Sequence, residues 1–294
     1  MVPFLDALNE AKSVLIAGCG GGFDVYAGVP LASYVMRRGA SVVFANLSFS
    51  NLAICGGERL APNCWRIDPR ANALPYFPER VLSEWLMRRS VSAPVYAVAK
   101  TGGEPLRSAY QAVLEKHPCD LVLLVDGGVD SVIFGDELGL GTPAEDAVSV
   151  CAATAAASGR AIVACLGFGI DDYHCVSHHA FLENVASLSL DCGYLGSISG
   201  TKETPEGADF LDLVEFANAR QPGLRSIVCN SIAYALRGNF GDYHSTSRTR
   251  GNELLITLQA IAIAQNAEKN TWRRLQNQGA DFDGLGRKLG GARA

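Results

Sequence analysis

Acidic side chains are crowded into one short stretch near the middle of this sequence. Six of them lie within residues 126–146, just after the apolar run LVLLV: Asp126, Asp130, Asp136, Glu137, Glu145 and Asp146. Carboxylates held close together repel one another, and a metal ion, a cationic ligand group or a shared proton usually stabilises them. We therefore expect the first four to be catalytic, and Asp126 with Asp130 to bind a divalent cation such as Mg²⁺ during the activation of water.

The residues around these acids suit a ligand-binding loop that leads into a helix. Thr142, Pro143 and Glu145 have the types and spacing of an N-cap, a first-turn proline and a capping-box glutamate. We therefore assign Glu145 to the start of a helix over 144–158 and not to catalysis. The ligand-binding residues that we expect in this stretch are Gly127, Gly128, Ser131 and Thr142.

A glycine-rich turn near the start of the chain reads AGCGGGFD over residues 17–24. Consecutive glycines let the backbone approach a ligand closely and turn its N–H groups inward, and the helix that follows favours negative charge at its N-terminus. We interpret this turn as a cradle for a phosphate or nucleotide. The ligand-binding residues expected here are Gly18, Gly20, Gly21, Gly22, Asp24 and, at the end of the second strand, Asn46.

Two other cofactors are alternatives for the same turn. A dinucleotide fingerprint that starts at Gly18 has Phe23 where glycine or alanine is usual, and Asn46 replaces the acid expected after the second strand. The string VLIAGCGGG is also similar to the first motif of class I methyltransferases, with Ile16-Ala17 in place of the usual acid. An NAD- or S-adenosylmethionine-dependent enzyme with a variant glycine loop is therefore an open alternative.

Two later loops carry further candidates for ligand binding and proton transfer. Asp171 follows the fifth apolar run, close to His174. The stretch GDYHSTSRTRG contains His244, Arg248 and Arg250. Arginine forks bind phosphate or carboxylate through paired hydrogen bonds, and histidine titrates near neutral pH. We expect Asp171 and both arginines to bind ligand, and His244 to act as a catalytic acid or base.

Composition excludes several classes of function. The 294 residues carry 25 Lys+Arg and 30 Asp+Glu, a net charge of −5, which disfavours a nucleic-acid partner. The nine cysteines form no CxxC pair, which is typical of a reducing cytoplasm and not of a disulfide framework or zinc site. We expect no signal peptide and no membrane partner. We expect a small-molecule substrate, and the composition also allows a homo-oligomer.

Apolar runs rich in β-branched residues alternate with longer helical patterns. We predict strands over 13–17, 41–46, 94–99, 120–125, 160–166 and 225–229. We predict helices over 25–38, 78–90, 105–117, 144–158, 178–191, 208–220 and 252–268. The alternation predicts a Rossmann-like α/β fold, three layers around a doubly wound, mostly parallel sheet of about six or more strands. We expect one domain over 1–278 and a glycine-rich tail over 279–294.

The motifs together resemble an uncharacterised family of bacteria and archaea, a domain of unknown function. The resemblance rests on the GGGxD turn at 20–24, DGGVDS at 126–131, GDE at 135–137, GTPAED at 141–146 and GDYHSxxR at 241–248. It implies a Rossmann-like architecture and supplies no catalytic residues. DGGVDS is also similar to the SGGVDS phosphate loop of N-type ATP pyrophosphatases, and its D-x-x-x-D spacing to the calcium loop of nucleoside hydrolases.

Because ligands bind at the carboxyl ends of strands in such a sheet, we expect these loops to form one site. The expected function is an enzyme acting on a nucleotide, a nucleoside or another phosphorylated metabolite, by hydrolysis or group transfer. A non-catalytic module that senses a nucleotide is the alternative from another class.

Overall fold

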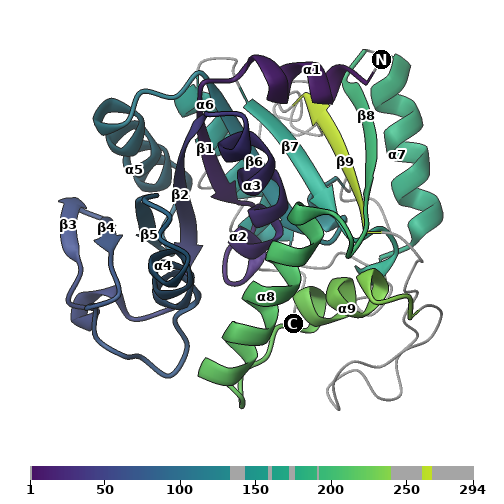
Figure 1. The fold of residues 1–294 in the computed structure, drawn as a ribbon. Helices are drawn as coiled ribbons and strands as arrows, with labels where there is room; N and C mark the ends of the chain where they lie inside the picture. Colours follow the sequence, from purple (N-terminus) through teal and green to yellow (C-terminus); the bar gives the residue numbers. More distant parts are fainter. Residues whose placement is uncertain are drawn as a thin grey trace, which may run out of the picture.

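The computed structural model describes residues 2–132, 143–157, 161–171, 176–190, 192–239 and 260–266. Its centre is a nine-stranded sheet in the order β3-β4-β5-β2-β1-β6-β7-β9-β8 (Figure 1). Five neighbouring strands run parallel: β5 (Val95–Ala99), β2 (Ser41–Ser48), β1 (Ser13–Gly18), β6 (Leu121–Gly127) and β7 (Ala161–Leu166). The chain thus follows a doubly wound course, which confirms the expected Rossmann-like class.

Antiparallel strands extend the sheet on both sides. The hairpin of β3 (Glu58–Ala61) and β4 (Cys64–Ile67) pairs with β5. At the other side β9 (Ala260–Asn266) lies between β7 and β8 (Tyr194–Gly200) and runs antiparallel to both. The last strand in the described part of the chain is therefore inside the sheet and not at its edge.

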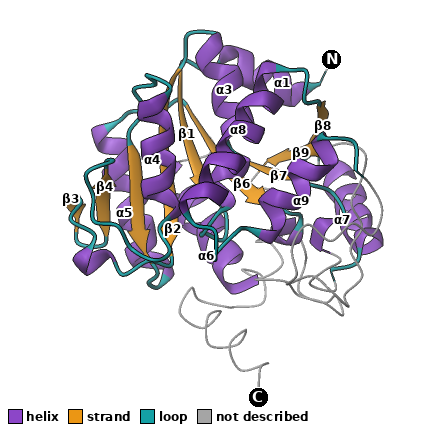
Figure 2. Ribbon diagram, turned by 60° about the horizontal axis from the view of Figure 1, so that its bottom comes forward, coloured by secondary structure: helices purple, strands orange, loops and turns teal. Residues whose placement is uncertain are grey.

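Helices cover both faces of the sheet (Figure 2). One face packs against α1 (Pro3–Glu10), α2 (Asp24–Ala27), α3 (Val29–Arg37), α4 (Pro78–Arg88), α8 (Pro205–Arg220) and α9 (Ile227–Leu236). The other packs against α5 (Gly103–Lys116), α6 (Pro143–Ala157) and α7 (His178–Leu190). The 3-10 turns η1 (Leu52–Ile54) and η2 (Asp130–Val132) lie in connecting loops. None of the described helices is both long and apolar enough to cross a membrane.

The apolar strand runs follow from burial on both faces. In β1, Val14 and Ile16 belong to the core under α3 and α8, whereas Leu15 and Ala17 belong to the core under α5 and α6. Successive side chains of a strand point to opposite faces, so a strand covered on both sides needs apolar residues at every position. This is why the first five predicted strands are confirmed within two residues at each end.

Two predicted elements have the opposite type. Residues 225–229 were expected to form a strand, but Ser226 caps helix α9 by accepting a hydrogen bond from the Cys229 N–H at 3.0 Å. Residues 252–268 were expected to form a helix, but 260–266 form β9. In that strand isoleucine and alanine alternate with the period of two that favours a strand, and partners on both sides complete its hydrogen bonds.

Two smaller differences concern element limits. The helix expected over 25–38 is divided at Gly28, because Pro30 lacks the N–H that would continue the α2 hydrogen-bond pattern. A Cβ at Gly28 would also lie only 2.3 Å from Ile16 Cγ2, so the chain passes too close to β1 for any side chain here. The second difference is strand β8, which lies where no strand was expected.

The strand order sets the place of the site. From β1 the chain crosses to β2 over the α3 face, and from β6 it crosses to β7 over the α6 face. The crossovers leave β1 and β6 in opposite directions, so the carboxyl ends of these two neighbouring strands form the switch point of the sheet, where doubly wound proteins have their ligand crevice. The glycine turn follows β1 and the DGGVDS loop follows β6, so both border this crevice.

Candidate active site at the carboxyl ends of β1 and β6

Five aspartates from five segments meet at this crevice, and we call them the aspartate cluster. They are Asp24 at the start of α2, Asp126 in β6, Asp130 in η2, Asp146 in α6 and Asp171 after β7. Asp126, Asp146 and Asp171 are each only 2% exposed, and Asp130 is 5% exposed. The structure thus brings Asp126, Asp130, Asp24 and Asp171 together, as the sequence predicted, and adds Asp146.

Two glycines leave the space that carboxylates of the cluster occupy next to the backbone. A Cβ at Gly20 would lie 1.9 Å from Asp146 Oδ1 and 2.9 Å from Asp24 Oδ2. A Cβ at Gly128 would lie 2.3 Å from Asp171 Oδ2. Gly20 and Gly128 also have φ angles of +96° and +136°, which side-chain-bearing residues rarely adopt. The glycines therefore let acidic side chains approach, and this is a different role from the phosphate cradle that we expected.

The backbone N–H groups of the DGGVDS loop are directed at carboxylates of the cluster. The Ser131 N–H donates to Asp126 Oδ2 at 3.1 Å, the Val129 N–H donates to Asp171, and the Gly127 N–H donates to Asp24. The Gly128 N–H donates to the Leu166 carbonyl at 2.9 Å. These donors hold the cluster in place, and because they are used within the protein they cannot also form the pyrophosphate contacts of an SGGVDS loop.

Burial and mutual repulsion disfavour the charged forms of these carboxyls. The pKa of Asp126 is raised well above its ordinary value, first by burial and then by the charges of Asp130 and Asp171. The pKa of Asp146 is raised in the same way, by burial and then by Asp130 and Asp126. Burial, followed by repulsion from Asp126, raises the pKa of Asp24 as well. The cluster therefore retains protons under conditions in which exposed aspartates have lost them, as an acid catalyst requires.

Two buried thiols lie beside the cluster. Cys165 is paired in register with Asp126, and its Sγ lies 3.3 Å from Ser131 Oγ. The Cys19 thiol contacts the Asp146 carbonyl oxygen at 3.8 Å. Burial is the first cause that raises the pKa of both thiols, and nearby aspartates raise it further. Both cysteines are therefore neutral wall residues of the site and not nucleophiles.

Hydrogen bonds to the neighbouring strands β2 and β6 stabilise the glycine turn. The Gly22 N–H donates to the Leu47 carbonyl at 3.0 Å, and the Cys19 N–H donates to the Val125 carbonyl at 2.7 Å. The Asn46 amide, which we expected to contact ligand, is fully buried and donates to the Gly22 carbonyl at 2.8 Å and to Glu79 Oε1 at 2.7 Å. The structure therefore assigns Asn46 to the support of the turn.

One residue of the cluster was not predicted, and several predicted site residues lie outside the described residues. Sequence reasoning did not select Asp146, although the acidic pair Glu145-Asp146 carried the signal: Glu145 pairs with Lys100 at 2.5 Å on the outside of α6, and Asp146 points into the cluster. The predicted site residues outside the described residues are Asp136, Glu137, Thr142, His244, Arg248 and Arg250. Residues 279–294, the predicted tail, also lie outside them.

The predicted cation site is not evident from side-chain arrangement. Within the described residues, no group of three or more His, Cys, Asp or Glu side chains has the arrangement of a metal site. Asp126 and Asp130 as ligands of a divalent cation therefore stay a prediction.

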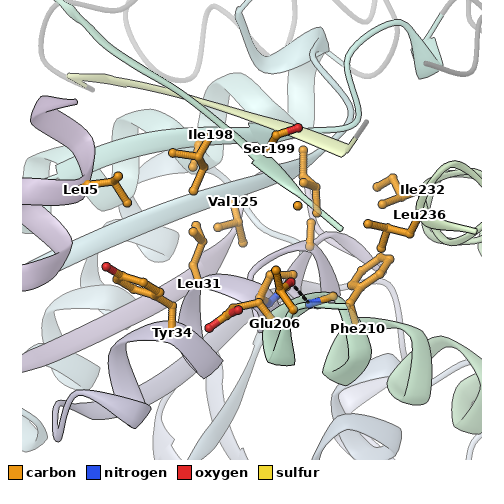
Figure 3. Close-up of a pocket in the computed structure, with 17 residues that line it drawn as sticks. Leu5, Leu31, Tyr34, Val125, Ile198, Ser199, Glu206, Phe210, Ile232 and Leu236 are labelled. Carbon is orange, nitrogen blue, oxygen red and sulfur yellow. Dashed lines mark hydrogen bonds between the residues drawn. The ribbon is translucent and has the colours of Figure 1, made fainter. Parts of the chain in front are cut away.

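A separate cavity of about 410 Å³ lies on the other face of β6 (Figure 3). Its wall is mostly apolar and includes Val125, Ile198, Phe210 and Leu236. Val125 precedes Asp126 in β6, so their side chains point to opposite faces of the sheet. Among the polar lining residues Glu206 is already paired with Arg37 at 2.8 Å. The aspartate cluster lies at the crevice, and we therefore place the candidate active site there and not in this apolar cavity.

The comparisons with known proteins agree with the resemblance seen in the motifs. Searches of curated proteins and of solved structures return no match to this chain. One family model, described as a protein of unknown function (DUF1152), matches residues 15–219, a segment that runs from β1 through α8 and contains the whole aspartate cluster. Since this match spans well over half of the sequence, the chain belongs to the DUF1152 family.

Proposed function

We propose that this protein is an enzyme that binds a nucleoside, a nucleotide or another phosphorylated small metabolite in the crevice between β1 and β6. The reaction is a hydrolysis or a group transfer in which a carboxyl of the aspartate cluster gives or takes a proton. The observation that carries the proposal is the convergence of five aspartates, four of them buried, with raised pKa values at Asp24, Asp126 and Asp146, at the switch point of a doubly wound sheet.

The energetic cost of the cluster supports a catalytic role. Burying carboxylates together is unfavourable, and a turn that only joined β6 to α6 would be more stable with amides or hydroxyls at the same places. Sites that hold like charges against repulsion are typical of enzymes, which need carboxyls with pKa values shifted toward the pH of the reaction. Asp126 and Asp130 are the proposed acid and base, since they lie in the loop that faces the crevice.

The contacts of the cluster indicate which part of a ligand it would bind. Carboxylates accept hydrogen bonds from hydroxyl and ammonium groups, whereas they repel phosphate. We therefore propose that the cluster binds the sugar hydroxyls of the ligand, with Asp24 and Asp146 on the side of the glycine turn. The predicted residues Arg248 and Arg250 would bind a phosphate of the same ligand, and His244 is the proposed second proton carrier.

A ligand panel with an isosteric variant tests this function. Nucleosides, nucleotides and sugar phosphates, each with and without Mg²⁺, are screened by thermal shift and by product analysis. We expect one class to raise the unfolding midpoint and to be turned over, since a ligand at 100 times its Kd stabilises by about 2.7 kcal/mol. Asp126→Asn keeps the size of the side chain and removes its proton transfer, so we expect it to lower turnover at least about 100-fold.

The matched control is Glu145→Gln, which makes the same chemical change at a residue that pairs with Lys100 on the outside of α6. We expect this control to retain wild-type turnover. If the ligand that binds is turned over equally by Asp126→Asn and by the wild type, the cluster is not catalytic. Tight binding without any turnover would instead identify a sensing module.

A further inference from the structure

A buried acid that does not belong to the aspartate cluster lies behind the glycine turn. Glu79 is the second residue of α4 and is fully buried. Its Oε1 accepts a hydrogen bond from Asn46 Nδ2 at 2.7 Å, and the same nitrogen donates to the Gly22 carbonyl at 2.8 Å. Asn46 therefore connects the glycine turn to α4, and Glu79 is the group that holds the far end of this connection.

Two oxygen atoms of this connection have no hydrogen-bond partner. They are Asn46 Oδ1 and Glu79 Oε2, and both are completely buried. Each would cost free energy if it stayed unsatisfied. Rotation of the Asn46 amide by half a turn offers no relief, because it would place its oxygen against the Gly22 carbonyl oxygen. The orientation of Asn46 is therefore fixed by the turn.

One proton on Glu79 satisfies both oxygen atoms. A carboxylic acid and a primary amide form a ring of two hydrogen bonds, in which the amide N–H donates to one acid oxygen and the acid O–H donates to the amide oxygen. The first of these bonds is the observed contact between Asn46 Nδ2 and Glu79 Oε1. The second would join Glu79 Oε2 to Asn46 Oδ1, the two atoms that otherwise lack partners.

We propose that Glu79 is a positioning residue of the crevice, held as a neutral acid that pairs with Asn46 and keeps the glycine turn in the shape that admits ligand. Loss of the proton opens the ring and loosens the turn. The inference rests on the proposed function only in so far as the turn borders the ligand; the pairing itself is a property of the fold.

The surroundings of Glu79 bring the pKa of its carboxyl close to neutral pH. Burial raises the pKa of Glu79 to about 7, and hydrogen bonds from Asn46 and Ser48 oppose the rise. From α2, Tyr26 interacts electrostatically with Glu79, and it is a neutral phenol because burial raises its pKa well above the ordinary value. Along α4, Arg80 pairs with Glu84 at 2.8 Å. The proton is thus held below neutral pH and lost above it.

The test compares the wild type with Glu79→Gln, whose amide reproduces the neutral acid: its N–H₂ donates to Asn46 Oδ1 and its oxygen accepts from Asn46 Nδ2. Hydrogen–deuterium exchange of the peptide spanning residues 18–28 is measured from about pH 5.5 to about pH 8.5 and corrected for intrinsic rates. In the wild type we expect protection to fall by up to about tenfold for each pH unit as the pH rises toward 7 and to level off above it, because Glu79 is then ionised whether the turn is closed or open. In Glu79→Gln we expect protection to stay constant.

Asp126→Asn is the matched control, because it removes a carboxyl of the cluster and leaves Glu79 in place. We expect it to keep the pH-dependent loss of protection. Equal pH dependence in the wild type and in Glu79→Gln would overturn the inference. If Glu79→Gln does not fold, the wild-type profile decides alone, since protection that does not change with pH has the same meaning. A ligand panel without any response would contradict the proposed function and leave this result unaffected.

Discussion

Asp126 illustrates how one side chain can serve a site at the expense of stability. It is buried beside Asp130 and Asp171, and its ionised form is disfavoured by burial first and by those charges second. A carboxyl whose pKa is higher in the folded protein than in the unfolded chain stabilises the fold most at low pH. This stabilisation is lost as the pH rises through the folded-state pKa, and at neutral pH Asp126 is a burden on the fold.

Replacing Asp126 by asparagine should therefore stabilise the protein while it removes activity. The asparagine oxygen can still accept the Ser131 N–H, and no charge has to be buried. We expect the free energy of unfolding at pH 7 to rise by about 1 kcal/mol, as is common when a site residue is neutralised. The gain should disappear below about pH 4, where the wild-type carboxyl is protonated in both states. Urea denaturation across this range measures it, and a destabilised variant at neutral pH would contradict the argument.

At the scale of the element, helix α9 depends on the residue that precedes it. The run RSIVC has the β-branched character of a strand, and a hydroxyl at Ser226 decides in favour of a helix by accepting the Cys229 N–H at 3.0 Å. The helix then packs Ile232 and Leu236 against the sheet. A capping serine can be recognised in the sequence. It indicates a helix only when the apolar residues after it recur with a helical period.

Ser226→Ala should destabilise the protein by about 1 kcal/mol, the usual value of a serine N-cap. The measurement is the midpoint of urea denaturation at constant m-value. Ser189→Ala is the control, because the exposed Ser189 hydroxyl donates to the Val185 carbonyl within α7 at 2.9 Å. We expect the control to change stability by less than about 0.5 kcal/mol. Equal effects of the two variants would show that the cap does not hold α9.

At the scale of the whole molecule, one buried carboxylate holds three helices together. Asp209 of α8 is 6% exposed and accepts hydrogen bonds from Ser33 and Arg37 of α3 and from Arg89 at the end of α4. The distance from Arg37 Nη1 to Asp209 Oδ2 is 3.3 Å. Because these helices cover β1 and β2, Asp209 supports the crevice from the back of the sheet.

Asp209→Ala should cost about 3 kcal/mol of stability or more, since it leaves two arginines and a hydroxyl without their shared acceptor. Glu206→Ala removes a neighbouring and more exposed partner of Arg37, so we expect it to cost less than about 1 kcal/mol. Thermal and urea unfolding of both variants measure the difference. Similar losses would indicate that Asp209 contributes no more than a surface ion pair.

The central sheet could be predicted because its five parallel strands are apolar along their whole length. The flanking strands could not, since Glu58–Ala61 and Tyr194–Gly200 are only half-buried and carry no apolar run. The site could be predicted for residues that follow the central strands, such as Asp126 and Asp171. Asp146 and Glu79 were missed because each is the inward-facing acid of a helix, and only the packed structure distinguishes it from an ordinary surface acid.

The place of β9 has a consequence for the synthesis of the chain. Residues 260–266 form hydrogen bonds with β7 on one side and β8 on the other, although β8 ends at residue 200. While the chain grows on the ribosome, β7 and β8 leave the exit tunnel first and have no contact with each other through the sheet. Each offers an unpaired edge, a template for unwanted pairing with other chains. The sheet becomes continuous only when β9 has been synthesised and has entered between them, so a late segment of the chain joins two strands made long before it.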